Sequence, residues 1–130
     1  MAVPEVMLQT PFIGSLGIVF DRYDHDDVLL RVPFRKDLTN DGLVYHGGVV
    51  AAAIDTAGAA VAWSNHDFDK GTRASTVSMS VQYVGTARES DLVCQATTVK
   101  RGKELIFTEI TATDSSGRVV AHAVQTYRIV

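Results

Sequence analysis

A long, almost uniformly apolar segment is the feature that most restricts what this chain can fold into. Residues 46–65 open with Gly47-Gly48 and continue through an alanine-rich run. Alanine has the highest helix propensity, so the segment predicts one helix of roughly 30 Å at ~1.5 Å per residue. Because the helix is apolar on nearly every side, we expect it to be buried, with the rest of the chain wrapped around it.

The remainder of the chain has the pattern of β-strands. Before the helix, residues 12–20 and 28–32 are apolar runs separated by a polar stretch at 21–27, and we interpret them as two strands and their connection. After the helix, apolar and polar side chains alternate from Thr76 to Tyr83. Three further strands are predicted at residues 92–99, 105–113 and 119–129.

Two short turns, at 101–102 and 114–117, join the last strands and predict an antiparallel meander. Residues 35–45 contain Asn40-Asp41-Gly42 without periodicity and are interpreted as a loop. The predicted fold is therefore α+β, with a long central helix wrapped by a curved six-stranded antiparallel sheet. A chain of 130 residues suits a single domain over residues 1–130.

Charge and composition exclude several classes of partner. The formal net charge is −3, which favours neither nucleic acid nor an anionic membrane surface. The N-terminus has no basic segment followed by an apolar run, and the apolar stretch 49–63 contains Asp55 and is shorter than the ~20 residues that span a bilayer. Cys94 is the single cysteine, so no internal disulfide forms, and we expect it to be a buried packing residue. These features predict a cytoplasmic protein.

Asp55 is the sole charged residue in the predicted buried helix. An unpaired carboxylate in apolar surroundings costs several kcal/mol, and its helix neighbours Ala51 and Ala59 cannot bond it. A partner must therefore come from elsewhere in the fold or from a second subunit. Asp55 is either a general base or nucleophile, or a structural residue that bonds a distant backbone N–H.

The loop that leads into the helix supplies a second candidate feature. A helix start offers unpaired N–H groups and a partial positive charge, and glycine there allows a substrate oxygen to approach the backbone. A thioester carbonyl bound to the Gly47 N–H would be polarised, as in an oxyanion hole. Each neighbouring residue also has a plain structural interpretation: Asn40 as a turn residue, His46 as a loop residue and Thr76 as a strand residue. The four histidines and Cys94 lack metal-ligand spacing, so no metal site is predicted.

The combined pattern Asn40-x5-His46-Gly47-Gly48-x6-Asp55, followed by an apolar helix, resembles the hotdog-fold thioesterases of the phenylacetate-pathway (PaaI-like) type. The resemblance extends from about residue 16 to residue 127 and includes the strand end at 83–87 and the turn at 101–103. It implies that Asp55 is the catalytic acid and that the Gly47 N–H binds the thioester carbonyl. It also implies that His46 and Asn40 orient the carbonyl or the water, and that the Thr76 hydroxyl helps to place the water.

The resemblance further implies an obligate dimer, with tetramers formed from two dimers, and an active site at the dimer interface. The substrate would be an acyl-CoA, hydrolysed to a free carboxylic acid and coenzyme A. No separate cofactor is expected, since coenzyme A is part of the substrate. The expected substrate contacts are Gly48, Arg88, Lys100, Arg101 and Lys103.

Two other functions suit the same fold. One is a non-catalytic acyl-CoA-binding protein, which needs no carboxylate that faces the thioester. The other is a hotdog hydratase of enoyl thioesters, which usually carries Asp and His in a different motif near the helix start. The position of Asp55 after His46-Gly47-Gly48 favours thioester hydrolysis over both.

Overall fold

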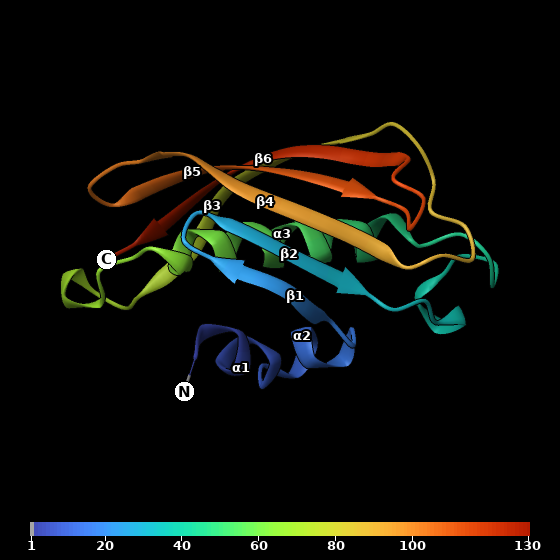
Figure 1. The fold of residues 1–130 in the computed structure, drawn as a ribbon, viewed down its shortest axis with the longest axis horizontal. Coiled ribbons are helices and arrows are strands. Elements are labelled where there is room, and N and C mark those ends of the chain that lie inside the picture. Colours follow the sequence, from blue (N-terminus) through green and yellow to red (C-terminus); the bar gives the residue numbers. More distant parts are fainter. Residues whose placement is uncertain (1) are drawn as a thin grey trace.

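One curved antiparallel sheet of six strands wraps around the long helix α3 (Gly47–Ser64) (Figure 1). The structure is a computed structural model that describes residues 2–130. The strands lie in the order β1-β2-β4-β5-β6-β3. Their bounds are β1 (Val19–Asp24), β2 (Asp27–Val32), β3 (Ala74–Tyr83), β4 (Leu92–Arg101), β5 (Leu105–Thr113) and β6 (Val119–Ile129). The predicted α+β hotdog architecture is confirmed.

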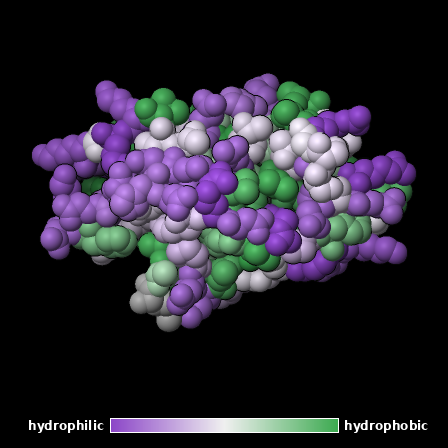
Figure 2. All heavy atoms as spheres, viewed as in Figure 1, coloured by the Kyte–Doolittle hydropathy of each residue, from purple (hydrophilic) through white to green (hydrophobic). Residues whose placement is uncertain are grey.

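Helix α3 is buried for most of its length, as its sequence predicts. Val50, Ile54 and Val61 are in the main core, and the alanines between them allow the strands to pack close to the helix backbone. By length and composition alone α3 is long and apolar enough to cross a membrane, but the sheet covers much of it, as expected for a core helix. The surface on the side shown in Figure 2 is mostly hydrophilic, with apolar groups in smaller patches.

The N-terminal region differs from the prediction. Residues 12–20 do not form one strand: two short helices, α1 (Val3–Leu8) and α2 (Pro11–Ser15), precede β1. A proline occupies the first helical turn in each, where its missing N–H costs nothing. The apolar residues of this segment pack as short helices, and Met7, Leu8 and Ile13 contact the core.

The boundary of β1 is also later than predicted, and the strand includes the polar residues 21–24. β1 is an edge strand, so polar side chains there can point to solvent. The turn to β2 is correspondingly short, with Asp26 in the left-handed region at φ 60°. The predicted loop at 35–45 is present and carries one 3₁₀ turn, η1 (Lys36–Leu38), while η2 (Phe68–Lys70) follows α3.

The predicted meander is confirmed for β4, β5 and β6. β3 pairs with β6 at the far edge of the sheet instead of with β4. The link after Tyr83 is too long for a tight hairpin, and it pairs with the loop before α3, where Tyr45 N–H donates to Ala87 O at 3.1 Å. The chain between β3 and β4 therefore runs past the start of α3. β3 is the last strand of the sheet, and its edge away from β6 is unpaired within residues 2–130.

Candidate functional site

The start of α3 presents one free backbone donor. His46 is the N-cap residue, and its Nδ1 accepts the Gly48 N–H at 2.8 Å. A neutral His46 therefore carries its proton on Nε2, which leaves that N–H available. The Gly47 N–H donates to no acceptor within residues 2–130, as expected for the first turn of a helix. Tyr83 on β3 donates its hydroxyl to Gly47 O at 2.8 Å and fixes this turn from the other side.

The loop before α3 has a defined shape. Asn40 N–H donates to Val44 O at 3.0 Å, and the Asp41 carboxylate accepts the N–H groups of Val44 and Leu43. These backbone hydrogen bonds, the one from Val44 first, hold the pKa of Asp41 below its usual value. The Asn40 side chain is exposed and forms no hydrogen bond within residues 2–130. Asn40 and His46 thus lie on the two paired arms of one short loop.

Asp55 is held by two side chains from the sheet. Its Oδ1 accepts the Thr76 hydroxyl at 2.7 Å and Gln125 Nε2 at 2.8 Å. No residue from 2 to 130 donates to Oδ2. The expectation that the partner comes from elsewhere in the fold is confirmed, and both partners belong to the same chain. One oxygen of the carboxylate is fixed and the other is free to react.

Gln125 is the functional candidate that sequence reasoning missed. It is 2% exposed, and its Nε2 also donates to Asp55 O at 3.0 Å, so it fixes both the backbone and the side chain of Asp55. Gly58 makes room for it, because a Cβ at position 58 would overlap the Gln125 amide. The sequence did contain a signal: Gln125 is an amide at an inward position of a strand whose other inward side chains are mostly apolar.

Asp55 opens onto a hollow of about 450 Å³. Thr76 and Ser75 of β3 form the polar wall beside the carboxylate, and residues of α1, α2, α3 and β6 form the rest. Tyr127 lies in this wall; burial first, and the nearby Asp55 carboxylate to a smaller extent, raise the pKa of its phenol. The carboxylate therefore faces a cavity with largely apolar walls.

Gly47 and Asp55 are far apart on one helix. Eight residues separate them, which is about 12 Å along the axis at ~1.5 Å per residue. A nucleophile must stand about 3–3.5 Å from the carbon it attacks. A carbonyl bound at Gly47 therefore lies beyond direct reach of Asp55 in the same chain.

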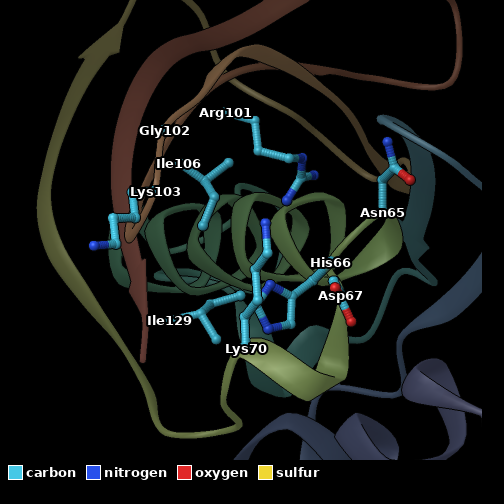
Figure 3. Close-up of a pocket in the computed structure, with 9 residues that line it drawn as sticks. All are labelled: Asn65, His66, Asp67, Lys70, Arg101, Gly102, Lys103, Ile106 and Ile129. Atoms are coloured by element: carbon cyan, nitrogen blue, oxygen red, sulfur yellow. The ribbon is translucent and has the colours of Figure 1, made fainter.

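The predicted coenzyme A contacts fall at opposite ends of α3. Arg88 pairs with Val44 near the helix start, whereas Arg101 and Lys103 line a hollow of about 240 Å³ at the helix end. Figure 3 shows Arg101 and Lys70 reaching into this hollow and Lys103 turning outward. Lys100 is exposed on β4.

Arg101 has an internal role that the sequence did not indicate. Its guanidinium donates to Ala62 O at 2.9 Å and to the Asp26 carboxylate at 2.7 Å. It therefore binds the carbonyl end of α3, where a positive charge is favourable. Gly48 is likewise engaged, because its N–H is already bonded to His46.

The remaining chemical candidates do not form a site. Cys94 is fully buried, which confirms it as a packing residue, and burial raises the pKa of its thiol to about 12. No group of three His, Cys, Asp or Glu side chains within the described residues is placed to hold a metal ion.

Comparison with known proteins places these features in a family. The family model described as "Thioesterase superfamily" matches residues 43–121, which include the start of α3, Asp55 and Thr76. A relative from Saccharolobus solfataricus, named "Putative esterase SSO1253", is 26% identical over 125 residues, which are 96% of this chain and 81% of the relative.

Two solved structures share the fold. The PaaI protein from the phenylacetic acid degradation operon of E. coli has a TM-score of 0.85 at 17% identity over 98% of this chain and 89% of its own. A hypothetical thioesterase from Streptococcus pneumoniae, determined with coenzyme A, has a TM-score of 0.77 at 18% identity over 87% of this chain and 85% of its own. The family match covers more than half of the sequence, and the chain therefore belongs to the thioesterase superfamily.

Proposed function

We propose that this protein hydrolyses acyl-CoA thioesters to a free carboxylic acid and coenzyme A, with Asp55 as general base or nucleophile. The observation that carries the proposal is the asymmetric setting of the carboxylate. Oδ1 is held by Thr76 and Gln125, Oδ2 accepts no hydrogen bond within residues 2–130, and Asp55 lines a largely apolar hollow. Thioester hydrolysis is the class of reaction that the superfamily indicates, and the acyl-CoA substrate and the residue roles are our inference.

Asp55 can act in either of two ways. As a base, Oδ2 takes a proton from a water molecule whose oxygen forms a bond to the thioester carbon, and the C–S bond then breaks. The departing sulfur recovers that proton and leaves as the coenzyme A thiol. As a nucleophile, Oδ2 itself bonds the carbon and displaces the thiolate, and water then hydrolyses the resulting anhydride. The fixed Oδ1 orients the carboxylate in both cases.

The start of α3 supplies the partial positive charge that stabilises the carbonyl oxygen of the thioester during attack. During attack the carbonyl oxygen becomes negative, and a donor that is already fixed stabilises it without reorganisation. The Gly47 N–H is such a donor, and the helix dipole adds to its effect. His46 Nε2–H and the Asn40 amide lie on the same loop, and in this proposal they orient the carbonyl or the water.

The separation of about 12 Å between Gly47 and Asp55 supports a site shared between two chains. In this arrangement the Gly47 N–H of one subunit and Asp55 of the other act on one thioester. The structure offers a surface for such pairing, since β3 has one unpaired edge and exposes Val77 and Tyr83. We therefore propose a homodimer, or a dimer of dimers, as the active form.

Coenzyme A is the proposed carrier of the acyl group. A structural neighbour determined with coenzyme A supports the choice of ligand. Arg88, Lys100 and Lys103 remain candidates for its phosphates because they are exposed and basic, whereas Arg101 is bonded inside the fold.

A substrate screen tests the function. The purified protein is incubated with aryl, short-chain and long-chain acyl-CoA esters, and released thiol is measured over time. We expect turnover of at least one class. An enoyl-CoA is included in the same screen: its loss without thiol release would indicate a hydratase, and tight binding of acyl-CoA without turnover would indicate a binding protein. Either result would overturn the proposal.

A further inference from the structure

The Asp55 hollow continues along α3 as a groove with a defined length. Asp55, Ala59 and Trp63 follow one another at intervals of four residues and therefore lie on one face of the helix. The small side chain of Ala59 leaves space between the carboxylate and the indole. We infer that this groove takes the acyl group as an extended, unbranched apolar chain of medium length, with its far end against Trp63 and Met7. The inference rests on the proposed thioester hydrolysis and specifies its substrate class.

The walls of the groove suit an apolar chain. Met7, Phe12 and Ile13 of the N-terminal helices form one side, and Tyr127 of β6 contributes to the other. Several polar atoms in the lining are already bonded to protein groups. The Thr56 hydroxyl donates to Ala52 O at 2.8 Å, and Trp63 Nε1 donates to the Tyr127 hydroxyl at 3.3 Å. A ligand therefore meets mainly methyl groups and aromatic faces along this path, and burial of its methylenes drives binding.

The position of Trp63 sets the length of the chain. It lies eight residues beyond Asp55, or about 12 Å along α3. An extended alkyl chain advances roughly 1.3 Å per carbon, since its C–C bonds are ~1.5 Å long and zigzag. A chain of about nine or ten carbons therefore reaches from the thioester to the indole. A butanoyl or phenylacetyl group would leave the Trp63 end of the groove empty.

A second apolar hollow of about 300 Å³ shares Met7 and Trp63 with the first in its lining. Trp63 stacks on Phe68 with ring centroids 5.5 Å apart. Because Met7 and Trp63 line both hollows, they form the wall between them, and Met7 gives the N-terminal helix α1 a role in chain length. Ala59 and Met7 are the specificity-determining residues that follow from this geometry.

Trp63 is the only tryptophan, so its fluorescence reports directly on the far end of the groove. Asp55→Asn protein, in which turnover is suppressed, is titrated with decanoyl-CoA, butanoyl-CoA and phenylacetyl-CoA. We expect a saturable change in Trp63 emission with decanoyl-CoA and at most a small change with the other two. Unchanged emission with decanoyl-CoA would overturn the inference, and would show that the groove is closed to the ligand, for example by a second copy of the chain.

Kinetics of the active enzyme provide a second measurement. We expect kcat/KM for decanoyl-CoA to exceed that for butanoyl-CoA and phenylacetyl-CoA at least tenfold, since about six more methylenes are buried than with butanoyl. Ala59→Leu places a branched side chain between Asp55 and Trp63 and should lower the decanoyl-to-butanoyl ratio at least tenfold. Val124→Leu, at an exposed valine of β6, is the control and should leave the ratio unchanged.

The outcomes separate this inference from the proposed function. Thiol release with no dependence on chain length, or with the same ratio in folded Ala59→Leu, would overturn the groove assignment and leave thioester hydrolysis standing. A Trp63 response to decanoyl-CoA without thiol release from any substrate would overturn the hydrolysis and keep the ligand position. If Ala59→Leu fails to fold, the Trp63 titration still decides the groove.

Discussion

At the scale of single residues, the Asp55 carboxylate is the centre of the proposed site. Its two hydrogen-bond donors come from neighbouring strands of the sheet, Thr76 from the edge strand β3 and Gln125 from β6. Hydrogen bonds to a charged group are shorter and stronger than neutral ones, and both distances are below 3 Å. They fix the rotation of the carboxylate, so that Oδ2 points in one direction.

Thr76 tests this positioning role. Thr76→Val keeps the shape and removes the hydroxyl, and we expect kcat to fall about tenfold or more, because a hydrogen bond to a charged group contributes ~1.5–3 kcal/mol. KM should change less, since Thr76 does not hold the coenzyme A portion. Thr76→Ser restores the hydroxyl and should recover most of the kcat. If the kcat of Thr76→Ser were as low as that of Thr76→Val, turnover would depend on the methyl group of Thr76 and the positioning role of its hydroxyl would be contradicted.

At the scale of elements, the end of α3 is tied to the sheet by one network. Arg101 of β4 bonds both the Ala62 carbonyl and Asp26, and Asp26 in turn accepts Asn65 Nδ2 at 2.9 Å. Burial alone would raise the pKa of Asp26, but the hydrogen bonds from Arg101 and Asn65 outweigh it and hold the pKa below its usual value. The ion pair thus fixes the helix that carries Asp55.

Removal of the Arg101–Asp26 ion pair should lower the free energy of unfolding by an amount that depends on pH. Arg101→Met leaves a carbonyl and a carboxylate without their partner, so we expect the free energy of unfolding at pH 7 to fall by about 2 kcal/mol. Because the pKa of Asp26 is lowered in the folded state, its contribution is present above the unfolded pKa of ~3.9 and is lost as the pH falls through the folded value. In denaturant unfolding, the difference in the free energy of unfolding between wild type and Arg101→Met should be smaller at pH 3 than at pH 7. A difference that is the same at both pH values would contradict the role of the ion pair.

The elements also show what can be predicted from sequence. The uniformly apolar, alanine-rich character of residues 46–65 and the lone charge among them were enough to place α3 and to single out Asp55, because burial of a charge is a strong local signal. The pairing of β3 with β6 was not predictable, since alternation identifies a strand but not its neighbour. The inward orientation of Arg101 depends on the turn after β1 and the end of α3, which meet only in the folded chain.

At the scale of the whole molecule, the proposed site needs two chains. The Gly47 N–H and Asp55 are about 12 Å apart along one helix, and β3 offers an unpaired edge on the same side. A two-fold dimer uses the same surface on both subunits, so each chain can give Gly47 to one site and Asp55 to the other. Symmetry then produces two identical sites from two incomplete ones.

Mixed dimers test the shared site. Gly47→Pro removes the N–H at the cost of adding the proline ring, and the backbone tolerates it because proline suits the first helical position and the preceding His46 is already extended. We expect Gly47→Pro and Asp55→Asn to be inactive separately. Their co-expression should recover about a quarter of wild-type activity, since half of the dimers are mixed and each carries one intact site. No recovery in proven mixed dimers would place both groups in one chain.

The most direct test of the account is the kcat of Asp55→Asn. The amide keeps the shape of the side chain and removes the negative charge that the mechanism requires. We predict that kcat for the best acyl-CoA substrate falls by ~10² or more, the scale of a lost acid–base group, while KM changes much less. The melting temperature should hold or rise, because a half-buried carboxylate becomes a neutral amide. A folded Asp55→Asn protein with wild-type kcat, or one whose only defect is a lower melting temperature, would contradict a catalytic role for Asp55.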